Sequence, residues 1–311
     1  MANILVTGGA GFIGSHLTRR FVDQGHSVRV LDDFSTGKRE NLAGVDKNVD
    51  LHEADLRDFG VCLRACGDID FVFHEAAVPS VPKSVEDPQT SHDVNATGTF
   101  NVLRAAVQCK VKRVIYAASS SAYGDTVESP KHERIMPEPL SPYAVQKLAG
   151  EHYARAFFEC YGLETVSLRY FNVFGDRQDP GSQYAAAIPA FVTLMLKGTA
   201  PTIYGDGEQT RDFTFIDNVL HGNTLAMKAD KTRGESINVA CGGAVSINTV
   251  IAQINRLLGT NIEPRYVDRR AGDVMHSCAD IRLAKELLGF EPVVGFDEGL
   301  RRAIDYYRSI A

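Results

Sequence analysis

Three polar residues near the middle of the chain have types and spacing that suit proton transfer. Tyr143 and Lys147 are four residues apart in a segment that predicts a helix, so both side chains lie on one face. A phenol titrates near pH ~10, and a neighbouring ammonium favours its ionised form. Ser119 follows the predicted strand Val114–Ala118, which places it at the carboxyl edge of a sheet, where ligands bind. The set predicts Tyr143 as a base, with Lys147 and Ser119 beside it.

A glycine-rich loop near the start of the chain predicts a dinucleotide site. Gly8, Gly11 and Gly14 lie in the sequence T-G-G-A-G-F-I-G, between a predicted strand and a predicted helix. Glycines there allow a tight turn and the close approach of a pyrophosphate, and the helix N-terminus offers unpaired N–H groups to the phosphates.

An acidic residue strengthens this prediction and selects the cofactor. Asp32 ends the second predicted strand, 18 residues after Gly14, where a carboxylate would bond the ribose hydroxyls. The same carboxylate repels a 2′-phosphate, so NAD is favoured over NADP. Lys38 and Arg39 follow closely and keep NADP open as the alternative.

Short apolar runs alternate with amphipathic segments in the first half of the chain, and this βαβα rhythm predicts a doubly wound parallel α/β fold. The predicted strands are Ile4–Thr7, Ser27–Leu31, Phe71–His74, Val114–Ala118 and Thr165–Arg169. The predicted helices between them are Ile13–Gln24, Phe59–Cys66, Ser91–Gln108 and Pro142–Cys160.

The rhythm breaks near residue 171, so we predict a dinucleotide-binding domain over residues 1–170 and a smaller α/β lobe over 171–311. A strand near 236–240 is expected to return to the first sheet. Ser141 is the expected N-cap of the helix that carries Tyr143, with Pro142 as its first residue. Helices are expected at Ile188–Lys197, Thr249–Leu258, Ile281–Leu288 and Glu298–Tyr307.

Composition excludes several classes of function. Asp and Glu outnumber Lys and Arg by 39 to 33, a net charge of −6, which argues against non-specific nucleic-acid binding. The six cysteines form no C-x-x-C pair and have no histidines at zinc-ligand spacing, so no metal site is predicted. The N-terminus carries no signal-peptide pattern, and the longest apolar stretch is shorter than the ~20 residues that span a bilayer. A cytosolic protein without membrane partners is expected.

Taken together, these motifs resemble the extended short-chain dehydrogenase/reductase family, in its nucleotide-sugar epimerase and dehydratase branch. The resemblance covers nearly the whole chain. Beyond the glycine loop, Ser119 and the Tyr143/Lys147 pair, it rests on H-E-A-A from His74, N-A-T-G-T from Asn95, L-R-Y-F-N-V-F-G from Leu168, G-D-G from Gly205, R-D-F from Arg211 and R-A-G-D from Arg270.

The resemblance implies roles for individual residues. Asn172 would hold the substrate, Arg211 and Arg270 would clamp a UDP diphosphate, and Asp273 would bind the uridine ribose. The NAD-binding residues that it implies are Gly8, Gly11, Phe12, Ile13, Gly14, Asp32, Asp33, Ser35, Thr36, Gly37, Asp55, Leu56, Ala76, Ala77, Asn95, Tyr143, Lys147 and Tyr170. The implied substrate-binding residues are Ser80, Ser119, Ser120, Ser121, Asn172, Tyr204, Arg211, Arg270, Asp273 and Ser277.

The residues after Ser119 decide which reaction is expected. The family implies that Tyr143 removes the sugar O4 proton while NAD⁺ oxidises C4. Dehydratases of this kind carry Asp-Glu next, and decarboxylating members a Glu at the second position, whereas this chain has Ser120 and Ser121. With no acid or base to divert the ketone, reduction from the opposite face is expected, which is 4-epimerisation.

The sugar is predicted from the resemblance of three segments, 117–124, 183–189 and 272–277, to UDP-N-acetylglucosamine 4-epimerases, together with a steric argument at one position. The resemblance places Ser277 in the wall of the sugar pocket, where a bulky aromatic would exclude a 2-acetamido group and a serine leaves room. UDP-N-acetylglucosamine is therefore the expected substrate. UDP-glucose is expected as a second substrate, and UDP-glucuronate is a further candidate. A non-catalytic NAD sensor or scaffold is the alternative of another class. The family also implies a homodimer formed through the Tyr143 helix and the segment Ser91–Gln108.

Overall fold

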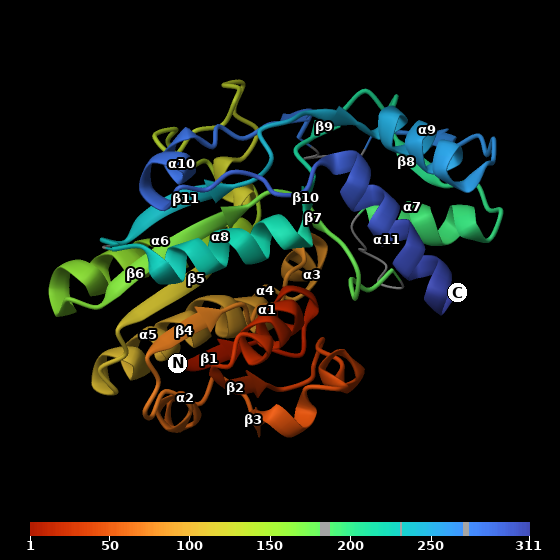
Figure 1. Ribbon diagram of the computed structural model, residues 1–311. Coiled ribbons are helices and arrows are strands. Elements are labelled where there is room, and N and C mark those ends of the chain that lie inside the picture. Colours follow the sequence, from red (N-terminus) through yellow and green to blue (C-terminus); the bar gives the residue numbers. More distant parts are fainter. Residues whose placement is uncertain (181–186, 231, 270–273) are drawn as a thin grey trace. The chain divides into compact units, whose positions relative to one another are not determined.

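The computed structural model describes residues 1–180, 187–230, 232–269 and 274–311 (Figure 1). The predicted residues Arg270 and Asp273 lie outside this part of the chain. The chain divides into two compact units that interleave along the sequence. The first unit comprises 1–122, 139–169 and 222–237, and the second comprises 123–138, 170–221 and 238–311.

A seven-stranded sheet organises the first unit, in the order β11-β6-β5-β4-β1-β2-β3. β1 pairs in parallel with both β2 and β4, so the strand order reverses at β1. This order confirms the doubly wound fold. The strands are β1 Asn3–Thr7, β2 Ser27–Asp32, β3 Val49–Glu53, β4 Phe71–His74, β5 Arg113–Ser119, β6 Glu164–Tyr170 and β11 Glu235–Val239.

The first six α-helices lie between β1 and β6 along the sequence. A buried apolar cluster, which includes Leu5, Val72, Val102 and Val114, joins the sheet to α2 and α5. The bounds are α1 Phe12–Asp23, α2 Phe59–Ala65, α3 Val81–Glu86, α4 Pro88–His92, α5 Thr99–Gln108 and α6 Pro142–Tyr161.

The segment predicted as one helix, Ser91–Gln108, is helical throughout, but its winding is not uniform. A π-helical segment, Asp93–Gly98, separates α4 from α5. Within it the backbone carbonyl of Asn95 accepts the Thr99 hydroxyl at 2.6 Å, and the Asn95 amide oxygen accepts the Val78 N–H at 2.8 Å. The Thr99 hydroxyl thus occupies a backbone carbonyl of the helix, and π-turns of this kind are frequent at functional sites.

The second unit is built from short strands and five helices among its described residues. Helix α8 was not predicted from the sequence, and its residues from 222 onwards belong to the first unit. The helices are α7 Ala187–Leu196, α8 Ile216–Lys228, α9 Ile247–Leu258, α10 Arg282–Leu288 and α11 Phe296–Ile310. The strands are β7 Val173–Phe174, β8 Thr202–Tyr204, β9 Thr210–Arg211, β10 Thr214–Phe215, β12 Val245–Ser246, β13 Arg265–Val267 and β14 His276–Ser277.

Candidate active site

The N-terminus of α6 positions the predicted base. Ser141 caps the helix by accepting the Ala144 N–H at 3.2 Å, and Pro142 is its first residue. The backbone N–H of Tyr143 is bonded to the Ser84 hydroxyl of α3 at 3.1 Å. Two local caps and one tertiary bond therefore fix the first turn, which carries Tyr143.

Lys147 lies one turn further, buried against β5. Its ammonium donates to the Ala117 carbonyl at 2.9 Å and lies 5.1 Å from the centre of the Tyr116 ring. The Tyr116 hydroxyl in turn donates to the Lys147 carbonyl. Burial lowers the pKa of Lys147, and the carboxylates of Glu75 and Glu151 act to raise it.

Ser119 completes the group at the carboxyl end of β5. It accepts hydrogen bonds from the backbone N–H and the hydroxyl of Ser121, at 3.2 and 2.8 Å, which leaves its own proton available to donate. A hydrogen bond from Ser119 lowers the pKa of Tyr143, but burial has the larger effect and raises it. A base role for Tyr143 therefore requires added positive charge near the phenol.

A buried histidine lies beneath Lys147. His74 stacks on Tyr116 with ring centres 5.6 Å apart, and its two ring nitrogens bond the hydroxyls of Thr7 and Thr99 at 2.7 and 2.9 Å. Burial lowers the pKa of His74 to about 3, so the ring is neutral near pH 7. His74 is thus a structural link between β1, β4 and α5.

The glycine loop leaves no room for side chains. A Cβ on Gly14 would lie 2.1 Å from the Gly8 carbonyl oxygen, and one on Gly8 would lie 2.7 Å from the Ala76 nitrogen. Gly8 also has φ +67°, which only glycine adopts freely. Gly11, the N-cap of α1, provides no capping side chain, so the first N–H groups of the helix are available to an anion.

Asp32 is held at the end of β2, facing this loop. Its carboxylate accepts the backbone N–H groups of Ala10 and Phe34 at 2.8 and 2.9 Å, and burial raises its pKa. Gly37 approaches so closely that a Cβ would lie 2.8 Å from this carboxylate. Asp33 accepts the N–H and hydroxyl of Ser35, which orders the turn.

Several predicted cofactor-binding residues are held in place by hydrogen bonds and packing near the end of β4. The Ala76 N–H donates to the Thr7 hydroxyl, and the Asn95 amide donates to Gln146 at 2.9 Å. Leu56 fills the space over Gly98, where a Cβ would lie 1.7 Å from a Leu56 methyl. Asp55, another predicted residue, forms an ion pair with Arg57.

Predicted substrate residues of the second unit meet on a small sheet. Arg211 of β9 pairs in register with Ser277 of β14, and Ser277 is buried. The Arg211 guanidinium donates to the Thr210 carbonyl at 2.9 Å. Asn172, at φ +36°, donates its side-chain amide to the Asp212 carbonyl at 3.1 Å.

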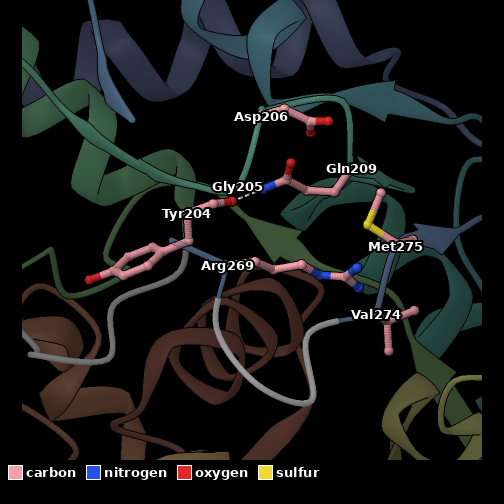
Figure 2. A pocket seen from close by; sticks show the side chains of 7 residues that line it. All are labelled: Tyr204, Gly205, Asp206, Gln209, Arg269, Val274 and Met275. Carbon is pink, nitrogen blue, oxygen red and sulfur yellow. Dashed lines mark hydrogen bonds between the residues drawn. The ribbon is translucent and has the colours of Figure 1, made fainter. Parts of the chain in front are cut away.

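A cavity of about 130 Å³ lies near this small sheet (Figure 2). Figure 2 shows the Arg269 side chain reaching across it towards Met275, and the Gln209 amide donating to the Tyr204 carbonyl at 2.7 Å. A cation in a concave surface of this size is suited to a small anion. The lining residues are Tyr204, Gly205, Asp206, Gln209, Arg269, Val274 and Met275.

Comparison with known proteins identifies the family. The model of the NAD dependent epimerase/dehydratase family matches residues 4–240. The chain belongs to this family. A UDP-N-acetylglucosamine 4-epimerase from Methanobrevibacter ruminantium, solved in complex with UDP-N-acetylmuramic acid, is 40% identical, with a TM-score of 0.96 over 100% of this chain and 99% of that one.

Two further epimerase structures are similar over the whole chain. A UDP-glucose 4-epimerase from Thermotoga maritima, solved with UDP-glucose, is 38% identical, with a TM-score of 0.95 over 99% of both chains. A UDP-glucose 4-epimerase from Thermus thermophilus, solved with NAD, is 36% identical, with a TM-score of 0.91 over 99% of this chain and 100% of that one. The expected family, NAD cofactor and isomerase class are confirmed, and the sensor alternative is set aside.

The residues of this epimerase/dehydratase chain fit the cofactor. Gly8 and Gly14 form a cradle that a Cβ would fill, the uncapped start of α1 faces it, and the buried Asp32 closes the loop. Among the described residues, no cluster of His, Cys, Asp or Glu could hold a metal ion. None of the helices in the described ranges is long and apolar enough to cross a membrane.

Some residues predicted for substrate binding have structural partners, and others that matter were missed. Ser80 caps α3 through the Lys83 N–H at 3.2 Å, so its hydroxyl serves that helix. Glu75 and Glu151 act electrostatically on Lys147 but were not singled out in the sequence. Glu151 could have been found, because it continues the four-residue spacing from Tyr143 through Lys147.

Asp212 is a third missed residue, fully buried in the second unit. Its carboxylate accepts backbone N–H groups of Cys241, Gly242 and Ala279 at 2.9 to 3.1 Å. Burial raises its pKa to about 6 despite these bonds. Asp212 joins three loops around the Arg211 strand, and its position directly after Arg211 was the available signal.

Proposed function

We propose that this enzyme interconverts UDP-N-acetylglucosamine and UDP-N-acetylgalactosamine by epimerisation at C4, with UDP-glucose and UDP-galactose as weaker substrates. The observation that carries the proposal is the Ser119–Tyr143–Lys147 group, with Ser121 rather than a carboxylate hydrogen-bonded to Ser119. A group that can move one proton but has no second acid–base pair beside it supports epimerisation over elimination.

Each residue of the group has a role that its contacts support. Tyr143 accepts the O4 proton, and the Ser119 hydroxyl, whose oxygen accepts from Ser121, would turn from Tyr143 to donate a hydrogen bond to O4 without transferring its proton. Lys147 supplies positive charge beneath the phenol from a position fixed by the Ala117 carbonyl. NAD, when bound, takes up and returns hydride at C4. The resulting 4-keto sugar turns its other face before the hydride returns.

The second unit supports the choice of sugar nucleotide. Arg211 would bind a diphosphate oxygen, since its planar fork matches phosphate geometry. Ser277 is small and lies beside Arg211 in the β9–β14 pairing, which supports room for an acetamido group. The UDP-N-acetylglucosamine 4-epimerase relative supports the same choice. UDP-glucuronate is the competing substrate, because the hydroxyls of Ser119, Ser120 and Ser121 suit a C6 carboxylate.

We also propose a homodimer and a cytosolic location. The six thiols are all free, which is typical of a reducing compartment.

A product assay tests the proposed function. Purified protein is incubated with UDP-N-acetylglucosamine, UDP-glucose or UDP-glucuronate without added cofactor, and the C4 epimers are separated and quantified. We expect the highest kcat/KM with UDP-N-acetylglucosamine. Preferred turnover of UDP-glucuronate would replace the proposed substrate, and no turnover of any of the three would reject the proposal.

A further inference from the structure

A buried ion pair lies one turn beyond Lys147 on α6. Glu151 accepts two bonds from Arg169 of β6, at 2.9 Å from Nε to Oε1 and 2.6 Å from Nη2 to Oε2. Both side chains are only 4% exposed. The Ser236 hydroxyl of β11 donates to the same Oε2 at 2.8 Å. The carboxylate is thus held by two strands of the central sheet.

A buried ion pair of this kind carries an energetic cost as well as joining α6 to β6. Removing two charges from water costs several kcal/mol per ion, which bidentate geometry and extra hydrogen bonds only partly offset. Removing one partner leaves an uncompensated buried charge, which is strongly destabilising, so the two side chains hold each other in place. Tyr143, Lys147 and Glu151 follow one another at four-residue intervals, so this fixed negative charge lies on the helix face that carries the base.

Lys147 is surrounded by titratable groups from several elements. Tyr143 and Glu151 share its helix, Glu75 and His74 come from the end of β4, and Tyr116 comes from β5. His74 is neutral, and burial keeps Tyr116 protonated. The groups that favour a charged Lys147 are therefore the carboxylates of Glu75 and Glu151.

The bonds that Arg169 and Ser236 make to Glu151 also explain why the Lys147 ammonium stays bonded to the Ala117 carbonyl. A free carboxylate four residues away on a helix would pair directly with the ammonium. Arg169 and Ser236 occupy the Glu151 oxygens instead, and the Lys147 ammonium bonds the Ala117 carbonyl. The negative charge acts from a distance without drawing the ammonium away from Tyr143.

We propose that the Glu151–Arg169 pair is a positioning device, a fixed counter-charge that keeps Lys147 an ammonium in place beside Tyr143. The proposal rests on the proposed 4-epimerase function for its purpose, but not for its test. Glu151 and Arg169 bond each other, Glu151 also bonds Ser236, and the proposed action of the pair on the base runs through Lys147.

The test follows the titration of Lys147 itself. Protein labelled with 13C at lysine Cε is titrated by NMR, and the Lys147 resonance is assigned by its loss in Lys147→Met. In Glu151→Gln, we expect the Lys147 titration to move to lower pH by roughly one unit, as for loss of a nearby opposite charge. An unchanged titration in the folded variant would overturn the proposal, whether or not the enzyme turns over any UDP-sugar.

The chain offers a matched control. Arg113 of β5 and Glu164 of β6 form a second ion pair in the same sheet, with Arg113 Nε and Glu164 Oε2 2.9 Å apart. This pair lies at the opposite end of β5 from Ser119. Glu164→Gln should lower the melting temperature and leave the Lys147 titration in place. An equal shift in this control would show that any lost ion pair disturbs Lys147, and would reject a specific role for Glu151.

A double variant covers the case in which Glu151→Gln does not fold. Glu151→Gln with Arg169→Met removes both charges and leaves no buried ion alone. We expect the Lys147 titration to move to lower pH by less than in Glu151→Gln. The alkaline limb of the pH dependence of kcat should also move to lower pH, while KM stays constant. A lower melting temperature with an unmoved titration would assign the pair a structural role only and overturn the proposal.

Discussion

Ser277 is the single residue on which the choice of sugar depends most directly. It is buried in β14 beside Arg211 of β9. Replacing it by tyrosine would add a ring to the position proposed as the pocket wall. Steric exclusion of one substituent changes relative specificity more than absolute activity.

Ser277→Tyr should therefore reduce kcat/KM for UDP-N-acetylglucosamine at least tenfold more than for UDP-glucose, a difference of about 1.4 kcal/mol. The ratio of the two specificity constants is the measurement. Cys278→Ser, one position along, is a control that should keep the wild-type ratio. A ratio unchanged by the tyrosine would show that Ser277 does not contact the acetamido group.

His74 carries a prediction about stability and pH. Its folded pKa of about 3 lies below the ordinary 6.5, so unfolded chains bind more protons in this range. Its contribution is fully present above pH 6.5 and is lost as pH falls towards 3. Each pH unit in that window costs about 1.4 kcal/mol from this group.

In His74→Gln, urea unfolding between pH 7 and pH 4.5 should show a shallower loss of the free energy of unfolding than in wild type. Glutamine can still both donate to one threonine and accept from the other, so the comparison isolates the titration. Equal slopes in the two proteins would mean that other groups govern acid unfolding. Asp212 has a raised pKa and contributes with the opposite sign, but it is present in both proteins.

At the scale of elements, the contact between α6 and β5 decides where Lys147 lies. Gly150 is the point of closest approach, since a Cβ there would lie 2.3 Å from the Tyr116 hydroxyl oxygen and 2.4 Å from its ring. Tyr116 is 1% exposed and is flanked by His74, so its ring has little space into which to move.

Gly150→Ala should lower the melting temperature and kcat together. Alanine favours a helix by about 1 kcal/mol, but overpacking a well-filled core costs about 1–3 kcal/mol and would displace Tyr116 and Lys147. Thermal unfolding and turnover are the measurements. Gly67→Ala, whose Cβ would meet its nearest atom only at 3.4 Å, is the control. A stabilised, fully active Gly150→Ala would show that α6 is free to shift outwards.

At the scale of the whole molecule, an apolar ribbon remains on the surface of the first unit. Phe100 of α5 contacts Tyr153 of α6 with ring centres 5.3 Å apart, and Phe157 contacts Tyr161 at 5.0 Å. Tyr153, Tyr161 and Val145 are all exposed along α6. The exposed rings of Tyr153 and Tyr161, with Phe100 partly exposed beside Tyr153, support the proposed homodimer.

Sedimentation should therefore give a mass near twice 34.0 kDa for the wild-type chain. Tyr153→Glu should convert it largely to monomer, because a charge would have to be buried at the interface. Leu287→Glu, at an exposed apolar position on α10, should leave the dimer intact. A monomeric wild type, or a dimer in Tyr153→Glu, would contradict the proposed interface.

Local sequence determined much of this protein. The glycine loop, Asp32 and the Tyr143/Lys147 spacing each lie within one strand, turn or helix, so periodicity and capping residues place them correctly on their own elements. The doubly wound fold followed from the same alternation. The π-helical winding within Ser91–Gln108 was not predicted, and the Asn95 side chain there bonds Val78 and Gln146, which no local pattern relates to it.

Only the tertiary structure decided the electrostatic surroundings of the proposed catalytic group. Glu75, Tyr116 and the Glu151–Arg169 pair reach Lys147 from three strands and its own helix, and no local pattern states which residues meet across a sheet. The physical reason is that spacing along one element sets only the face on which a side chain lies. What that face meets, and therefore its pKa, depends on pairing between segments distant in sequence.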